Sequence, residues 1–248
     1  MYYRKEMTAT YYDCDVNNLL KPAAMMRYMQ QTSSEQLSVL GQSVEHLYER
    51  GMVFLLSGSN IAVHRAPVCG ERISVGTAAT GTKGVRFFRE FTVDTLEGER
   101  LVSCLSVWAL VDTQCHKILR PNTYPHAIEW QEPGVDEQLY ASLIPKEIPQ
   151  DAQPRVVEQE IYYSHLDINS HVNNSMYADF ACDALPFEEL TKQGIGLLAL
   201  SFQREARHGD VLKIERALIS PGRYKVTGTN GAQPCFEAYV CMGGKSAI

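Results

Sequence analysis

Two distant segments of this chain repeat one pattern, and the repeat constrains the fold more than any other feature. Residues 11–19 align with residues 162–171 when one gap is allowed. The alignment matches two polar residues of each segment, pairing Asp15 with Asp167 and Asn17 with Asn169. A repeated pattern indicates that one structural unit occurs twice, so the sequence predicts two similar halves.

A helix pattern follows each repeated segment. In the first half, Pro22 suits an early helix position, and apolar residues recur at helical spacing until Gly41. They are Met25, Met29, Leu37 and Leu40. In the second half, cap residues at 173–175 precede an apolar face that ends before Pro186.

After each helix pattern the apolar period changes to two, which predicts strands. They are expected near 52–64, 71–80, 84–94 and 100–112, and again near 195–206, 211–219, 222–229 and 233–242. A single long helix cannot bury its apolar face alone, and a curved antiparallel sheet around it is the economical solution. The predicted fold class is therefore α+β, a tandem (double) hotdog in which each half wraps an antiparallel sheet around one long helix.

Prolines mark the boundary between the halves. Six of the eleven prolines lie between Pro121 and Pro154, in a stretch with little helix or strand periodicity. We therefore expect an N-terminal half over residues 1–120, a linker over 121–154 and a C-terminal half over 155–248.

Composition excludes several classes of function. The net charge of −6 argues against a nucleic-acid partner. Seven cysteines without a C-x-x-C pair predict free thiols in a reducing compartment. No apolar run approaches the ~20 residues that span a bilayer, and none resembles a leader. We expect a cytoplasmic protein without membrane insertion, and the sequence leaves open whether it forms a homodimer.

Residues 165–174 place polar groups directly before the second helix. Thioester hydrolysis needs donors for an oxyanion, a base, and help for the departing thiolate. Asn169 can donate, His171 can exchange a proton near neutral pH, and Asp167 can orient a partner, act as a base or attack the carbonyl. Amides at the helix N-terminus would add donors. A metal site made of His165, Asp167 and His171 matches no known ligand spacing.

These residues resemble the acyl-acyl carrier protein (acyl-ACP) thioesterases of plants and bacteria. In that family the second hotdog half carries Asp-x-Asn-x-His-Val-Asn-Asn, found here at residues 167–174, and Tyr177 matches an aromatic residue of the helix. A glutamate that follows an arginine in the family is matched by Glu205. The resemblance implies that fatty acyl-ACP is hydrolysed in fatty acid biosynthesis without metal or organic cofactor. It implies four catalytic residues: Asp167, Asn169, His171 and Glu205.

The partner implied by the resemblance is an acyl carrier protein that carries a fatty acyl-phosphopantetheine. Many plant members have a cysteine after the glutamate, where this chain has Ala206, so a cysteine nucleophile at that position is excluded. Activated water or a carboxylate must attack instead. On the expected strand, period two places Gln203, Glu205 and Arg207 on one face.

The first half lacks the groups that could move a proton. The alignment sets Leu19 opposite His171. A similar overlay of Arg65-Ala66-Pro67 on Arg204-Glu205-Ala206 sets Ala66 opposite Glu205. We therefore expect the first half to be non-catalytic and to hold the acyl chain. The candidate substrate-binding residues are Met25, Met29, Asn173 and Asn174.

Three other functions fit parts of the pattern. An acyl-coenzyme A thioesterase would use the same pantetheine arm, and a hotdog dehydratase would also use histidine and a carboxylate. A non-catalytic acyl-chain binder has no need of four such polar groups in an apolar tunnel.

Overall fold

The computed structural model describes residues 1–149, 152 and 154–243. Residues 150, 151 and 153 of the expected linker, and residues 244–248 of the expected second half, lie outside the described residues. No helix in the described ranges is both long enough and apolar enough to cross a membrane.

The first half contains five strands and two α-helices besides a short 3-10 helix. In chain order they are β1 (Tyr3–Thr8), η1 (Tyr11–Asp13), α1 (Pro22–Val39), α2 (Val44–Glu49), β2 (Met52–Val63), β3 (Arg72–Lys83), β4 (Arg86–Thr95) and β5 (Arg100–Asp112). Two further 3-10 helices follow, η2 (Pro121–Thr123) and η3 (Glu137–Tyr140).

The second half repeats this order. It comprises β6 (Arg155–Glu160), η4 (Tyr163–His165), α3 (Met176–Asp183), α4 (Phe187–Gln193), β7 (Ile195–Phe202), β8 (Val211–Ser220), β9 (Arg223–Asn230) and β10 (Gln233–Met242).

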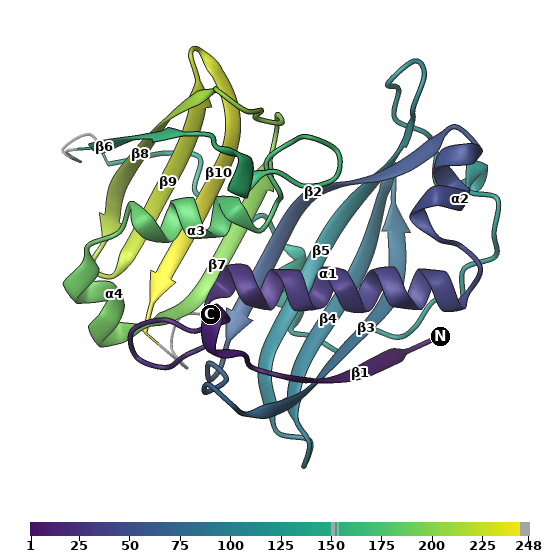
Figure 1. Ribbon diagram of the computed structural model, residues 1–248, viewed down its shortest axis with the longest axis horizontal. Coiled ribbons are helices and arrows are strands. Elements are labelled where there is room, and N and C mark those ends of the chain that lie inside the picture. The colour runs from purple at the N-terminus through teal and green to yellow at the C-terminus, as the bar shows by residue number, and fades with distance from the viewer. Residues whose placement is uncertain (150–151, 153, 244–248) are drawn as a thin grey trace.

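The ten strands of the described residues form one antiparallel sheet in the order β1-β3-β4-β5-β2-β7-β10-β9-β8-β6. Helices α1 and α3 lie on the same face of this sheet (Figure 1). The predicted double hotdog is therefore the observed architecture, with the two half-sheets fused along β2 and β7.

The second helix is shorter than expected. Helix α1 begins at Pro22 as predicted and has 18 residues, whereas α3 has eight. Proline disfavours the helical conformation of the residue before it, so Pro186 prevents α3 from continuing into α4 and is the N-cap of that separate helix.

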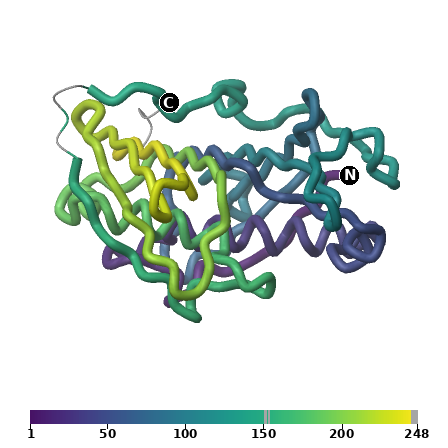
Figure 2. Tube along the Cα trace, turned by 90° about the horizontal axis from the view of Figure 1, so that it is seen from above, coloured from purple at the N-terminus to yellow at the C-terminus, as the bar shows by residue number. Residues whose placement is uncertain are grey.

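Alternation along the strands divides the apolar residues between two cores. On β2, Ile61 packs in the cluster that contains Met25, while Ala62 packs on the opposite face with Leu197. The segment between the halves covers that opposite face (Figure 2). Leu139 of η3 is fully buried there, and its carbonyl accepts a hydrogen bond of 2.7 Å from Nδ2 of Asn60.

The pairing of β2 with β7 relates the halves by an approximate twofold axis. Asn60 pairs with Ala199 at the centre of this antiparallel ladder. Asn60 lies five residues before Arg65, and Ala199 lies five residues before Arg204, the residues matched by the repeat. The strands therefore pair around a point where equivalent positions meet, as a twofold axis requires.

The expectation that the strand near 195–206 carries Glu205 is wrong. Strand β7 ends at Phe202, because the amides of Gln203 and Arg204 both donate to the carbonyl of Cys235, at 2.9 and 3.2 Å. Such a bulge ends the regular ladder. Glu205 therefore lies in the loop after β7, and period two does not set its direction.

Candidate active site

Asp167, Asn169 and His171 share one tight turn. The amide of Asp167 donates to the carbonyl of His171 at 2.9 Å, and the amide of Ser170 donates to the carbonyl of Asp167 at 3.0 Å. Oδ1 of Asp167 accepts the amide of Asn169 at 2.8 Å. Ser170 has the left-handed φ of 62° that closes the turn. The side chain of Asp167 thus fixes the loop that presents Asn169 and His171.

The first half builds the same turn. The amide of Asp15 donates to the carbonyl of Leu19 at 2.8 Å, and Oδ1 of Asp15 accepts the amide of Asn17 at 2.8 Å. Asn18 takes the left-handed φ of 62°, as Ser170 does in the second half. The alignment of the repeated segments is therefore confirmed.

The side chains of His171 and Glu205 meet across the two loops. Nδ1 of His171 lies 2.9 Å from Oε2 of Glu205, with the side chains 28% and 49% exposed. An ionised carboxylate can only accept, so the proton of a neutral imidazole stays on Nδ1. Nε2 of His171 then keeps its lone pair and can take a proton from water or another donor.

Three contacts hold Glu205 in place. NH2 of Arg207 lies 2.7 Å from Oε1 of Glu205. The next residue, Ala206, donates its amide to the hydroxyl of Tyr177 at 3.2 Å and accepts the amide of Val172 at 2.9 Å. Burial raises the pKa of the Tyr177 phenol, so this hydroxyl stays neutral. The loop of Glu205 is therefore fastened to both α3 and the turn before it.

The equivalent loop of the first half has the same backbone but not the same chemistry. The amide of Leu20 donates to the carbonyl of Pro67 at 2.8 Å, as Val172 does to Ala206. Leu19 and Ala66 stand where the second half has its histidine and glutamate. Neither side chain can exchange a proton, so this loop lacks a base.

The first amides of α3 are less available than expected. The amide of Ser175 donates to Oδ1 of Asn173 at 2.9 Å, and the amide of Met176 donates to its carbonyl at 2.9 Å. The expectation of open donors is wrong for these two amides, because the side chain of Asn173 accepts one and its backbone carbonyl accepts the other. By contrast, Asn169 is exposed, and its Nδ2 has no hydrogen-bond partner among the residues that the structure describes.

The other polar residues of the segment have mainly structural contacts. Nδ1 of His165 accepts the amide of Tyr162 at 3.1 Å, and the ring packs edge-on against Phe180, with centroids 5.3 Å apart. Asn173 builds the start of α3, and Asn174 is half-buried. Within the described ranges, no three His, Cys, Asp or Glu side chains form a group that could hold a metal ion.

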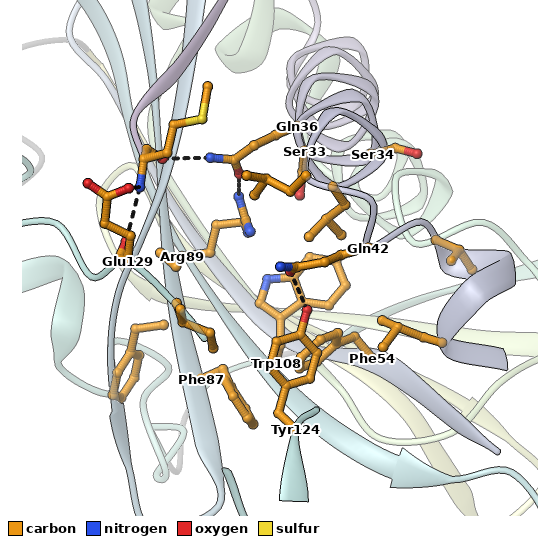
Figure 3. A pocket seen from close by; sticks show the side chains of 18 of the residues that line it. Ser33, Ser34, Gln36, Gln42, Phe54, Phe87, Arg89, Trp108, Tyr124 and Glu129 are labelled. Carbon is orange, nitrogen blue, oxygen red and sulfur yellow. Dashed lines mark hydrogen bonds and ion pairs between the residues drawn. The ribbon is translucent and has the colours of Figure 1, made fainter. Parts of the chain in front are cut away.

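A cavity of about 330 Å³ lies in the first half, and nothing in the sequence located it. It opens between the C-terminal part of α1, α2 and the sheet, and residues 124–130 cover one side (Figure 3). Most of its lining is apolar and includes Leu37, Leu47, Phe54, Phe87 and Trp108. Its polar residues include Gln36, Gln42, Arg89 and Tyr124.

The predicted tunnel residues do not line this cavity. Met25 and Met29 are 1% and 2% exposed and pack in the core between α1 and the sheet. The α1 residues that line the cavity follow Met29 along the helix; they are Gln30, Ser33, Ser34, Gln36 and Leu37. A role of Met25 and Met29 in acyl-chain binding stays a prediction.

The strand register places Glu205 and the cavity toward the same end of β2. Strand β7 separates from β2 after the pair Ser201 and Gly58, and Glu205 follows. Beyond this point, β2 continues through Phe54 and Val53, which line the cavity.

Models of two domains match most of the chain. The acyl-ACP thioesterase N-terminal domain matches residues 1–122, and the acyl-ACP thioesterase C-terminal domain matches residues 149–236. The chain belongs to the acyl-ACP thioesterase family.

Curated members of the family are distant relatives. A chloroplastic acyl-[acyl-carrier-protein] hydrolase of Cuphea viscosissima is 23% identical over 235 residues, covering 89% of this chain and 56% of that protein. A chloroplastic dodecanoyl-[acyl-carrier-protein] hydrolase of Umbellularia californica is 23% identical over 226 residues, covering 85% and 58%. The chain thus spans little more than half the length of these relatives.

Solved acyl-ACP thioesterases share the fold. An acyl-ACP thioesterase of Bacteroides thetaiotaomicron superposes with a TM-score of 0.86 at 22% identity, covering 97% of both chains. The 12:0-ACP thioesterase of Umbellularia californica gives 0.83 at 18% identity, covering 98% of both. At these identities the likeness establishes the double hotdog fold.

Proposed function

We propose that this chain hydrolyses fatty acyl-ACP thioesters to a free fatty acid and the carrier thiol. The contact of 2.9 Å between His171 and Glu205 carries the proposal, because it creates a general base beside a donor-bearing turn. Family membership supports the substrate class, since the matching domains are those of acyl-ACP thioesterases.

The chemistry follows from the proton on Nδ1 of His171. Nε2 takes a proton from water as the water oxygen attacks the thioester carbonyl carbon. Glu205 stabilises the imidazolium that forms, as an acceptor at Nδ1 does in a catalytic triad. The tetrahedral intermediate then collapses, the C–S bond breaks, and the imidazolium returns its proton to the departing thiolate.

Asn169 and Asp167 have different roles in this scheme. The exposed Nδ2 of Asn169 donates to the carbonyl oxygen as it becomes an oxyanion. We assign Asp167 the orienting role, because its Oδ1 already accepts the amide of Asn169 at 2.8 Å. The backbone contacts of Asn173 support a structural role for that residue rather than direct substrate binding.

The first half supplies the acyl-chain site in this proposal. Its cavity is largely apolar, as a fatty acyl chain requires, and it lies toward the end of β2 where Glu205 leaves the sheet. Its turn carries Leu19 in place of the base, which supports a binding role without chemistry.

We also propose a reducing compartment such as the cytoplasm. All seven cysteines are free thiols, and disulfides persist mainly in oxidising environments.

The test presents the same acyl groups on carrier protein and on coenzyme A, and follows free-thiol release. The proposal predicts turnover of both with a higher kcat/KM for the carrier protein. Preference for coenzyme A would contradict the carrier assignment. Tight binding without thiol release would identify a non-catalytic binder and contradict the activity.

A further inference from the structure

Arg89 places a cation in the wall of the apolar cavity. It lies on β4, and its NH1 donates to Oε1 of Gln36 at 2.5 Å (Figure 3). The same NH1 donates to Oγ1 of Thr77 at 3.0 Å. Both acceptors are neutral. No carboxylate lies within ion-pairing distance of Arg89 in the described part of the chain.

The remaining donors of Arg89, Nε and NH2, have no hydrogen-bond partner in the described part of the protein. Neither atom is fully buried, since in that part of the chain the fully buried side-chain atom without a partner is Nε2 of His126. These nitrogens therefore keep at least a small accessible surface, and Arg89 lines the cavity. Burial lowers the pKa of the guanidinium to about 10, which still leaves it charged at neutral pH.

Neighbouring side chains fix the direction of Arg89. Nε2 of Gln36 donates to the carbonyl of Met1 at 2.7 Å, which turns its Oε1 toward the guanidinium. The hydroxyl of Tyr124 donates to Gln42 at 2.6 Å across the cavity. A charge in apolar surroundings is unfavourable without a partner, so a ligand oxygen at Nε and NH2 would stabilise this arrangement.

Arg89 lies far from the proposed reaction centre. In the sheet, β4 is separated from β7 by β5 and β2. Three strand spacings amount to roughly 14 Å, before Glu205 continues beyond the end of β7. Arg89 would therefore contact an acyl chain well away from its thioester carbon.

We infer that this cavity selects acyl chains bearing a hydrogen-bond-accepting oxygen toward the end remote from the thioester, recognised by Nε and NH2 of Arg89. The inference rests on the proposed function and narrows its substrate class to oxygenated acyl chains. A hydroxyl, an oxo group and a carboxylate share this acceptor chemistry.

The experiment compares acyl-ACP substrates of equal chain length that end in a methyl group, a hydroxyl or a carboxylate. We expect the wild-type chain to favour a terminal oxygen by roughly ten- to a hundredfold in kcat/KM, as hydrogen bonds to a charged group allow. Arg89→Met should prefer the methyl-ended chain. The control Arg86→Met, on the same strand but exposed and outside the cavity, should behave as wild type.

Two outcomes would overturn the inference. One is a wild-type preference for the methyl-ended chain at every length in a matched series. The other is an oxygen preference that survives in Arg89→Met. If Arg89→Met does not fold, Arg89→Lys decides the question: its shorter cation should reduce the preference, and an unchanged preference would overturn the inference.

Binding separates this inference from the proposed function. Thioether analogues of the same chains on pantetheine cannot be hydrolysed, so their affinities report the cavity alone. Hydrolysis of methyl-ended acyl-ACP with equal affinity for all thioethers would overturn the inference and leave the function intact. If no acyl-ACP is hydrolysed but the thioethers show a preference that depends on Arg89, the proposed function is overturned and the binding preference of the cavity is kept.

Discussion

Nδ1 of His171 lies 2.9 Å from Oε2 of Glu205, joining a turn before α3 to a loop that follows β7. The two residues are separated by more than thirty positions in the sequence. Their meeting depends on the bulge that ends β7 and on the hydrogen bonds of Ala206 to Tyr177 and Val172.

Tyr177 positions the glutamate loop through a buried contact. Tyr177→Phe removes the acceptor of the Ala206 amide and leaves that buried donor unpaired. We expect the free energy of unfolding to fall by about 1–3 kcal/mol, with a lower kcat because Glu205 is adjacent. Urea titration and steady-state kinetics measure both effects. The exposed Tyr162→Phe is the matched control, and equal behaviour of the two variants would refute the positioning role.

The equivalent turns that begin at Asp15 and Asp167 allow a matched pair of variants to be compared. Oδ1 of Asp15 accepts the amides of Asn17 and Leu19, so Asp15→Ala should lower the free energy of unfolding by about 1 kcal/mol. Its single-turnover rate should stay that of the wild type, since the first half has no base. Asp167→Ala changes the equivalent residue and should slow the chemical step. A slow chemical step in well-folded Asp15→Ala would contradict the division between the halves.

Alkylation should leave the active site competent. Burial raises the pKa of the Cys182 and Cys235 thiols, so little reactive thiolate is present near neutral pH. We expect iodoacetamide to modify the exposed Cys115 first, without loss of turnover. Mass spectrometry with a parallel activity assay checks this. Rapid inactivation that substrate prevents would argue for a thiol in the mechanism, with Cys182 on α3 the first suspect.

Asp179 predicts a pH-dependent stability. Burial raises the pKa of this α3 carboxyl, although Lys21 and Arg27 oppose the shift. Because the pKa of this carboxyl is higher in the folded than in the unfolded protein, its contribution to stability is greatest below the unfolded pKa of about 3.9. That contribution is lost as the pH rises through the folded-state pKa. Asp179→Asn should therefore unfold at higher urea concentration than wild type at pH 7. The advantage should shrink toward pH 4, and an advantage that grows there would refute the assignment.

The repeat made the fold predictable from sequence, because Asp15 and Asp167 begin turns with the same hydrogen bonds. The motif also located His171 in its turn. The position of Glu205 was harder, since the bulge at Cys235 depends on pairing with a distant strand.

The cavity could not be predicted. It forms only through tertiary packing, which brings together Arg89 of β4, Gln36 of α1 and Tyr124, which follows β5. The helical periodicity of the sequence instead predicts Met25 and Met29 as acyl-chain residues, and these pack in the core.

The most direct test of the account is the single-turnover hydrolysis of acyl-ACP by Glu205→Gln and His171→Ala. We expect each variant to fold normally and to slow the chemical step by roughly 10²–10⁴-fold, as loss of a general base does. The surface control Glu215→Gln, whose partner is Lys213 on β8, should match the wild type. A wild-type single-turnover rate in well-folded Glu205→Gln or His171→Ala would contradict the central claim that this pair drives hydrolysis.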